Sequence, residues 1–252
     1  MMPLPDDGRA LIWEGCVNIR DLGGLPTSDG GTTRRGAVVR ADSVRQLSDV
    51  GWAALVGYGI GRIVDLRWQS ELAADPPREL PVETVHIPLF PEPDSDHWPE
   101  IDALDEAAPD AEAAKGAVYV ECLERFSSSF VTVVGAIVET PKGGALVHCM
   151  GGKDRTGLVS ALLLRLADVS VEDIAEDYAM SGENLRAATD EWIESAANDD
   201  ERRRRERMAV TPASAMATVL TELETRYGGA REYLLNAGAG EEMVERARAL
   251  LR

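Results

Sequence analysis

The chain has 252 residues, of which 44% are hydrophobic, and it carries a formal net charge of −18 at pH 7. This acidity argues against non-specific binding to nucleic acid or to anionic membranes, and no apolar run approaches the roughly 18 residues that a membrane-spanning helix needs. Three cysteines and three histidines without paired spacing predict neither a disulfide framework nor a zinc site.

The first residues include acids and prolines and form no apolar signal core. We therefore expect a cytoplasmic protein, with export by a route that needs no signal peptide as the alternative. The length fits one domain over residues 1–252. The sequence indicates no particular oligomeric state.

Predicted strands and helices alternate in the first part of the chain. Residues 38–40 form a short strand, and Ser48 is suited to cap a helix that ends at the glycines 57, 59 and 61. Residues 60–66 and 82–89 predict two more strands, with Pro76 and Pro77 in the connection between them.

Residues 90–110 have a different composition, with four prolines and many acids. Such a segment buries little apolar surface, so we predict a mobile excursion or lid over about residues 90–115. One long helix or two should then cover residues 111–140, and residues 145–148 form a short apolar strand.

After that strand the pattern is helical to the end of the chain. We expect helices over residues 171–180 (capped by Ser170), 184–197 and 213–226, and two short ones after the glycines 228 and 229. The basic run at 201–207 lies between helices, and its flanking acids favour a solvated helix face or hinge over a patch for lipid headgroups. The whole pattern predicts an α/β fold, with helices packed on a small sheet.

The segment that carries chemistry is His-Cys-Met-Gly-Gly-Lys-Asp-Arg-Thr-Gly, residues 148–157. It follows a predicted buried strand and precedes a helix, and five residues separate Cys149 from Arg155. The intervening N–H groups can surround one tetrahedral anion, and the helix adds its positive dipole end. The phosphate-binding residues predicted in this way are Met150, Gly151, Gly152, Lys153, Asp154 and Arg155.

Cys149 is the predicted nucleophile, because a positive field favours the thiolate, which can attack phosphorus and form a thiophosphate. The Arg155 guanidinium can bind two phosphate oxygens, Thr156 can offer its hydroxyl to the sulfur, and His148 orders the loop. A buried inert cysteine is the alternative, but the two glycines and the arginine disfavour it. The loop lacks the Lys-Ser/Thr pair of magnesium-binding loops, so we expect no metal or other cofactor.

This segment resembles the His-Cys-x5-Arg-Ser/Thr signature of protein tyrosine phosphatases, and its Lys-Asp pair is similar to the bacterial tyrosine/serine branch. Asn-Ile-Arg-Asp-Leu-Gly-Gly at 18–24, Val-Arg-Ala-Asp-Ser at 39–43 and Val-Asp-Leu-Arg at 64–67 resemble other elements of that branch. The resemblance runs from about residue 14 to the C-terminus. It implies a small central sheet flanked by helices, a helical C-terminal half and a lid-like insertion.

Two carboxylates are candidates for the general acid that protonates the leaving oxygen. The bacterial branch places its distinctive aspartate where Asp154 stands. Glu100 follows Trp98 and Pro99 and so resembles the Trp-Pro-Asp loop of eukaryotic tyrosine phosphatases, but it replaces Asp and lies far upstream. We favour Asp154.

Several charged residues have supporting roles in this interpretation. Lys153 either binds a second phosphate on the substrate or strengthens the positive field. Asn18 and its neighbours Arg20 and Asp21 brace the loop. Asp65 and Arg67 either line the pocket or form a structural ion pair.

We therefore predict a metal-independent hydrolase of phosphate monoesters that acts first on phosphotyrosine and has dual specificity for phosphoserine and phosphothreonine as an extension. Since some members of the bacterial branch act on phosphoinositides, a phosphoinositide substrate is the alternative. A silent phosphate-binding module, an arsenate reductase and a sulfurtransferase are the rivals from other classes. A phosphorylated protein or phosphoinositide is the expected partner, without nucleic acid and without stable membrane insertion.

Overall fold

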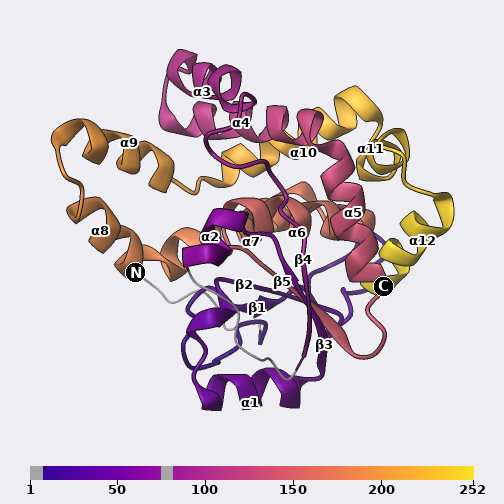
Figure 1. Ribbon diagram of the computed structural model, residues 1–252. Helices are drawn as coiled ribbons and strands as arrows, with labels where there is room; N and C mark the ends of the chain where they lie inside the picture. The colour runs from indigo at the N-terminus through magenta and orange to yellow at the C-terminus, as the bar shows by residue number, and fades with distance from the viewer. Residues whose placement is uncertain (1–7, 75–81) are drawn as a thin grey trace.

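The computed structural model describes residues 8–74 and 82–252 (Figure 1). The predicted proline connection at 76–77 and the first seven residues lie outside this range. Within it, no helix has both the length and the apolar character that crossing a membrane would require.

Five strands form one sheet in the order β1-β2-β5-β3-β4. Strand β1 (Arg20–Asp21) is antiparallel to β2 (Val38–Ala41), whereas β2, β5 (Gly144–His148), β3 (Ile60–Asp65) and β4 (Glu83–His86) are parallel. All five residues of β5 are buried, as expected for a central apolar strand with neighbours on both sides. Its last residue is level with the ends of β2 and β3, so the carboxyl ends of three strands meet at one edge.

Successive residues of the central strands contribute to two separate cores. Val38 and Val147 belong to the larger core, whereas Val39 and Leu146 belong to a smaller one that contains Trp52. This alternation follows from the period of two in a strand, which turns neighbouring side chains to opposite faces of the sheet.

Helix α1 (Asp49–Tyr58) covers the smaller core and lies at the bottom of Figure 1. The Ser48 hydroxyl caps it by accepting a hydrogen bond from the Gly51 N–H at 3.2 Å, as predicted. The 3-10 turn η1 (Val44–Gln46) precedes it.

The other face of the sheet is covered by the helical part of the chain. In helix α6 (Asp154–Leu166), 11 of 13 residues are buried, which identifies it as the central helix of the larger core. Around it lie α4 (Ala111–Arg125), α5 (Ser127–Val138), α7 (Val171–Asn184), α10 (Ala213–Tyr227), α11 (Ala230–Asn236) and α12 (Glu241–Leu250). The α/β prediction is therefore confirmed, and the segment predicted as one helix or two consists of two.

The acidic, proline-rich segment is more regular than we expected. It contains helix α3 (Trp98–Ala107), with Pro99 in the first turn, where a missing N–H costs nothing. Trp98 packs against Phe90 and Phe126, and Ile101 is buried. The sequence did not predict this helix, which a few apolar side chains suffice to dock, and the mobile excursion or lid over about residues 90–115 stays a prediction.

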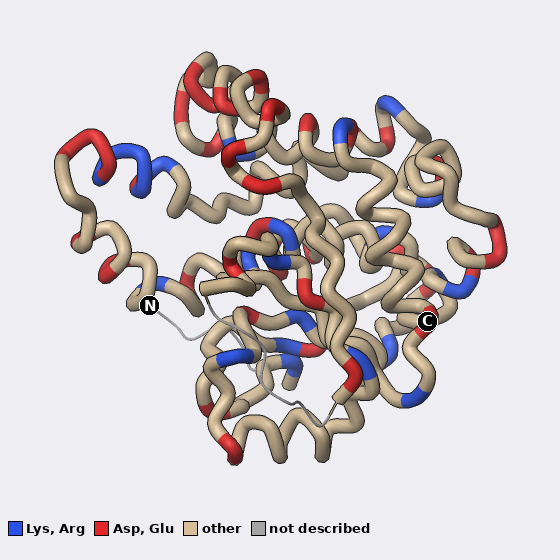
Figure 2. Tube along the Cα trace, in the orientation of Figure 1, with Lys and Arg blue, Asp and Glu red and all other residues tan. Residues whose placement is uncertain are grey.

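One other prediction needs correction, and one helix was missed. The basic run at 201–207 does not lie between helices but within α9 (Asp199–Ala209), which follows α8 (Arg186–Glu194) and is capped by Asn198. Figure 2 shows consecutive basic positions along α9, whereas the charged positions along α3 are acidic. Helix α2 (Gln69–Ala74) was not predicted at all.

Candidate active site

The Cys149–Arg155 segment connects the central strand to the central helix. Cys149 directly follows β5, and Asp154 is the first residue of α6. The sequence pattern of strand, loop and helix therefore exists in the structure. It places the loop at the edge where the parallel strands end, which is the usual ligand edge of an open α/β sheet.

Each carbonyl oxygen from residue 149 to residue 152 has a hydrogen-bond partner in the surrounding structure. In loop order the partners are Nδ1 of His148 at 3.1 Å, the backbone N–H of Ser43 at 2.9 Å, Nδ2 of Asn18 at 2.8 Å and Nη2 of Arg40 at 2.8 Å. The N–H groups of residues 150–154, by contrast, donate to no group in the described part of the chain. The loop thus keeps its donors unused, as an anion-binding loop must.

Gly152 makes the tightest turn of the loop. Its φ is +64°, and a Cβ atom would lie 2.3 Å from the carbonyl oxygen of Ala41 on β2. Gly151 is less constrained, because a Cβ there would meet only Leu185, at an ordinary 3.5 Å. Only Gly152 is therefore required as glycine by the backbone.

Cys149 is only 3% exposed and packs at the edge of the larger core. The Thr156 hydroxyl is also buried, and it has no hydrogen-bond partner among the described residues. Buried hydroxyls normally have a partner, so this one is available to the sulfur or to a bound ligand.

The Arg155 guanidinium is held by two contacts that the sequence did not suggest. Glu71 of α2 accepts hydrogen bonds from Nη1 at 2.6 Å and from Nη2 at 2.8 Å, and the ring of Trp68 lies 4.3 Å from the guanidinium carbon. Burial alone would lower the pKa of Arg155, but Glu71 and Cys149 outweigh it and raise the pKa. Arg155 is therefore a permanent cation in a fixed plane.

A local signal for Glu71 exists in the sequence. Its Oε2 accepts a hydrogen bond from the backbone N–H of Trp68 at 2.7 Å, just before the helix begins. A glutamate at the third position of a helix often bonds back in this way, so the start of α2 could have been found. Its contact with Arg155 could not, because 84 residues separate the two in sequence.

Asp154 lies among cations and a tyrosine. Its Oδ1 accepts a hydrogen bond from the Tyr119 hydroxyl and lies 3.5 Å from Nζ of Lys115 and 3.8 Å from Nζ of Lys153. Burial opposes ionisation, but Lys153, Lys115 and Tyr119 together lower the pKa of Asp154 to about 2. The carboxyl is thus ionised near neutral pH in the free protein, although its side chain retains 42% exposure.

The two lysines share one further contact. Nζ of Lys115 lies 2.9 Å, and Nζ of Lys153 lies 3.0 Å, from the carbonyl oxygen of Met208 near the end of α9. Helix α9 therefore reaches the side of the loop.

A buried cluster behind the loop anchors its carbonyls. Asp177 of α7 pairs with Arg40 at 2.6 Å, with Arg9 at 2.8 Å and with Arg20 at 2.9 Å. Arg40 then donates to the Gly152 carbonyl, and Arg20 donates at 2.7 Å to Asn18, which holds Gly151. Burial acts against the Asp177 carboxylate, but Arg20, Arg40 and Arg9 outweigh it and strongly lower its pKa.

Asn18, Arg20 and Asp21, which we predicted to brace the loop, make different contacts. Asn18 contacts the loop directly, and Arg20 acts through Asn18. Asp21 instead binds the backbone N–H groups of Gly23 and Gly36 at 2.7 Å each. Sequence reasoning missed Asp177, whose position on a distant helix leaves no local signal.

Residues 11–252 match the model of a family that is described as the tyrosine phosphatase family. The chain belongs to that family. This phosphatase is 30% identical over 224 residues to a tyrosine-protein phosphatase of Nostoc commune, covering 85% of this chain and 74% of that protein. It is 27% identical over 276 residues to the triple specificity protein phosphatase PtpB of Mycobacterium tuberculosis, covering 94% of this chain and 97% of that one. The family resemblance carried by the loop is confirmed.

The second carboxylate candidate lies apart from the loop of the phosphatase. Glu100 stands in the first turn of α3, its side chain is 72% exposed, and it pairs with Arg125 of α4. In the described part of the chain it contacts no loop residue.

Asp65 and Arg67 form a buried ion pair beside the loop. The Arg67 Nη2 lies 2.8 Å from Oδ2 of Asp65, and Nε2 of His148 lies 3.6 Å from the same oxygen. Burial lowers the pKa of His148, which favours the neutral ring. These contacts match the structural alternative for Asp65 and Arg67.

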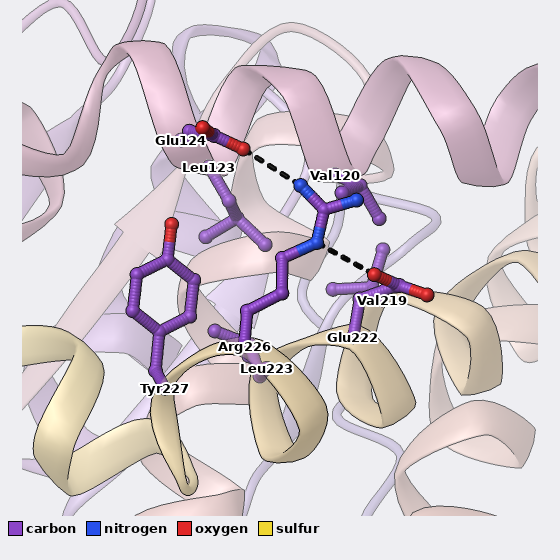
Figure 3. Close-up of a pocket in the computed structure, with 8 residues that line it drawn as sticks. All are labelled: Val120, Leu123, Glu124, Val219, Glu222, Leu223, Arg226 and Tyr227. Atoms are coloured by element: carbon purple, nitrogen blue, oxygen red, sulfur yellow. Dashed lines mark hydrogen bonds and ion pairs between the residues drawn. The ribbon is translucent and has the colours of Figure 1, made fainter.

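A hollow on another part of the phosphatase lies between α4 and α10 (Figure 3). Arg226 bridges Glu124 at 2.7 Å and Glu222 at 2.6 Å there, and no residue of the loop lines it. Among the described residues, no group of three or more His, Cys, Asp or Glu side chains is arranged to hold a metal ion.

Proposed function

We propose that this phosphatase hydrolyses phosphate monoesters, first of all those of protein tyrosine, through a covalent thiophosphate on Cys149. The observation that carries the proposal is the loop itself. Its carbonyls are bound to the scaffold, its N–H groups have no partner in the described chain, and Arg155 stands at its end. Donors held in this way stabilise the charge that develops on the phosphoryl oxygens.

The reaction proceeds in two displacements. The Cys149 thiolate attacks phosphorus, the bond to the ester oxygen breaks, and Asp154 gives its proton to the departing oxygen. Water then attacks phosphorus and gives a proton to the Asp154 carboxylate. The P–S bond breaks, inorganic phosphate leaves, and Thr156 stabilises the returning thiolate.

The low pKa of Asp154 in the free protein fits an acid whose proton affinity depends on the substrate. The ammonium groups of Lys153 and Lys115 are the main causes of that low value. A bound phosphoryl dianion offsets their field and raises the pKa of Asp154, so the carboxyl is protonated in the complex.

The substrate range extends in our proposal to phosphoserine and phosphothreonine, which the name of the mycobacterial relative supports. A phosphoinositide is the second candidate, because Lys115 and Lys153 bring two ammonium groups to the same carbonyl oxygen beside the loop. A second phosphate could replace that oxygen.

We also propose that the chain forms one catalytic domain in the cytoplasm, which its three free cysteines support. Residues 90–115 remain our candidate for a lid. Trp98 of α3 contacts Trp68 edge to face, with the ring centroids 6.4 Å apart, and Trp68 stacks on Arg155.

The test is turnover of 4-nitrophenyl phosphate and of a phosphotyrosine peptide in the presence of a metal chelator. The Cys149→Ser variant should bind vanadate but lose turnover, and acid quenching of the parent protein should trap a phosphorylated cysteine. Cys16→Ser is the control, since Cys16 is a free thiol outside the loop. Turnover that survives in Cys149→Ser would overturn the mechanism, and anion binding without turnover in the parent protein would favour a silent binding module.

A further inference from the structure

Two buried tyrosine hydroxyls form a chain that ends on Asp154. The Tyr119 hydroxyl of α4 contacts Oδ1 of Asp154 and lies 2.9 Å from the Tyr178 hydroxyl of α7. Tyr119 is 4% exposed and Tyr178 is 1% exposed. An ionised carboxylate can only accept hydrogen bonds, so Tyr119 donates to Asp154 and Tyr178 donates to Tyr119.

The packing fixes both rings. Their centroids lie 6.0 Å apart at an interplanar angle of 84°, the edge-to-face arrangement that aromatic pairs prefer. The ring of Tyr178 also rests on the first turn of α6, where a Cβ on Gly157 would lie 3.0 Å from its Cδ2. The two hydroxyls are thus tied to the helix that carries Asp154.

The other charged groups that face Asp154 also have a second partner. Lys115 of α4 and Lys153 of the loop approach it at 3.5 and 3.8 Å, but both also bind the Met208 carbonyl. Arg155, next in the chain, is engaged by Glu71. A buried aromatic ring has far fewer rotamers than a lysine, so the tyrosine sets the direction of the carboxyl.

We propose that Tyr119 is a positioning residue of the phosphatase reaction. Its hydroxyl, oriented by Tyr178, binds one oxygen of the Asp154 carboxyl and so leaves the other to face the departing ester oxygen. The transferred proton moves from that second oxygen to the leaving group, and Tyr119 keeps its own proton. The inference rests on the proposed role of Asp154 as the general acid.

The test is the dependence of the rate on the leaving group, because proton donation matters more for a poor leaving group than for a good one. In Tyr119→Phe we expect kcat/KM for phenyl phosphate to fall about tenfold and kcat/KM for 4-nitrophenyl phosphate to fall less than about threefold. The larger loss is only a part of the full effect of a general acid, because Asp154 is still present. Asp154→Asn should show the same selectivity with a larger loss. The double variant should lose no more than Asp154→Asn alone, because Tyr119 acts through Asp154.

A second readout is the alkaline limb of the kcat–pH profile. The Tyr119 hydrogen bond favours the ionised carboxyl, so Tyr119→Phe should move this limb to higher pH. The matched control is Tyr233→Phe, which removes another buried hydroxyl that binds α4, through the Leu123 carbonyl at 2.6 Å. It should change neither the leaving-group selectivity nor the position of the limb.

Three outcomes would contradict the inference, two of them for Tyr119 alone. An equal loss on both esters in Tyr119→Phe, or a loss that adds to that of Asp154→Asn, would overturn the role of Tyr119 and leave Asp154 as the acid. If Asp154→Asn itself showed no selectivity for the poor leaving group, the proposed acid would be wrong, and the role of Tyr119 with it.

Discussion

Replacing Asp177 by asparagine should destabilise the protein severely. Asp177 is a buried carboxylate with three guanidinium partners at 2.6 to 2.9 Å, and all four side chains are at most 3% exposed. The Asp177→Asn variant keeps the shape of the side chain but removes the carboxylate charge that the three buried guanidinium groups share. Breaking a buried ion pair costs about 3–5 kcal/mol, which is a large part of a typical unfolding free energy of about 5–15 kcal/mol.

Urea unfolding followed by tryptophan fluorescence measures this loss. With a slope of about 1–3 kcal/mol per molar urea, the midpoint should fall by at least about 1 M. The control is Asp173→Asn on the same helix, where the carboxylate binds Ser170 at the exposed first turn. A loss below about 1 kcal/mol in Asp177→Asn, the value for an exposed pair, would refute the reasoning.

The same variant has a predicted pH dependence. The pKa of Asp177 is lower in the folded state than in the unfolded chain, so its contribution is complete above the unfolded value of about 3.9. That contribution is lost as the pH falls below this value toward the folded pKa. The stability difference between the parent protein and Asp177→Asn should therefore be constant from neutral pH to about pH 5 and shrink in more acidic solution.

Three further changes test the loop, the arginine and a helix cap. Gly152→Ala should abolish turnover of 4-nitrophenyl phosphate, because its Cβ would overlap the Ala41 carbonyl of β2, whereas Gly151→Ala should retain most activity. Equal losses in the two variants would contradict the assignment of the tight turn to Gly152. Glu71→Gln should lower the unfolding free energy by about 1–3 kcal/mol, because it removes the charge from two hydrogen bonds to Arg155. An unchanged melting temperature would count against the ion pair of Glu71 and Arg155. Ser48→Ala should cost about 1 kcal/mol in urea unfolding with unchanged kcat/KM, and a change in kcat/KM would show that α1 influences the loop.

The sequence predicted the parts of the fold that depend on local pattern. The apolar run before Cys149 could be assigned as a buried strand, and the Ser48 cap placed the start of α1 correctly. Helix α3 was missed because its prolines and acids outweighed a few apolar residues in the composition. Its stability depends on Trp98 and its aromatic neighbours, which come together only in the tertiary structure.

The candidate site likewise combines features that the sequence predicted with residues that it did not. The spacing from Cys149 to Arg155 was sufficient to predict the loop between β5 and α6, and the role of Cys149 as the nucleophile stays a prediction. The residues that hold the loop and its charges, Glu71, Tyr119 and Asp177, come from α2, α4 and α7. No sequence spacing connects them to the loop, so only the packing of the helices reveals them.

The bonding of the loop carbonyls has a consequence for ligand selection. Because the carbonyl oxygens already accept hydrogen bonds, the peptide planes cannot turn over without breaking those bonds, and we expect the floor of the site to keep its conformation when an anion binds. In the proposed function, such a floor would contact only the tetrahedral oxyanion of the substrate. Discrimination among esters has to come from the rim, where Met150 is exposed and Lys115 and Lys153 lie. A change of preferred substrate would therefore require new side chains at the rim and no change in the backbone of the loop.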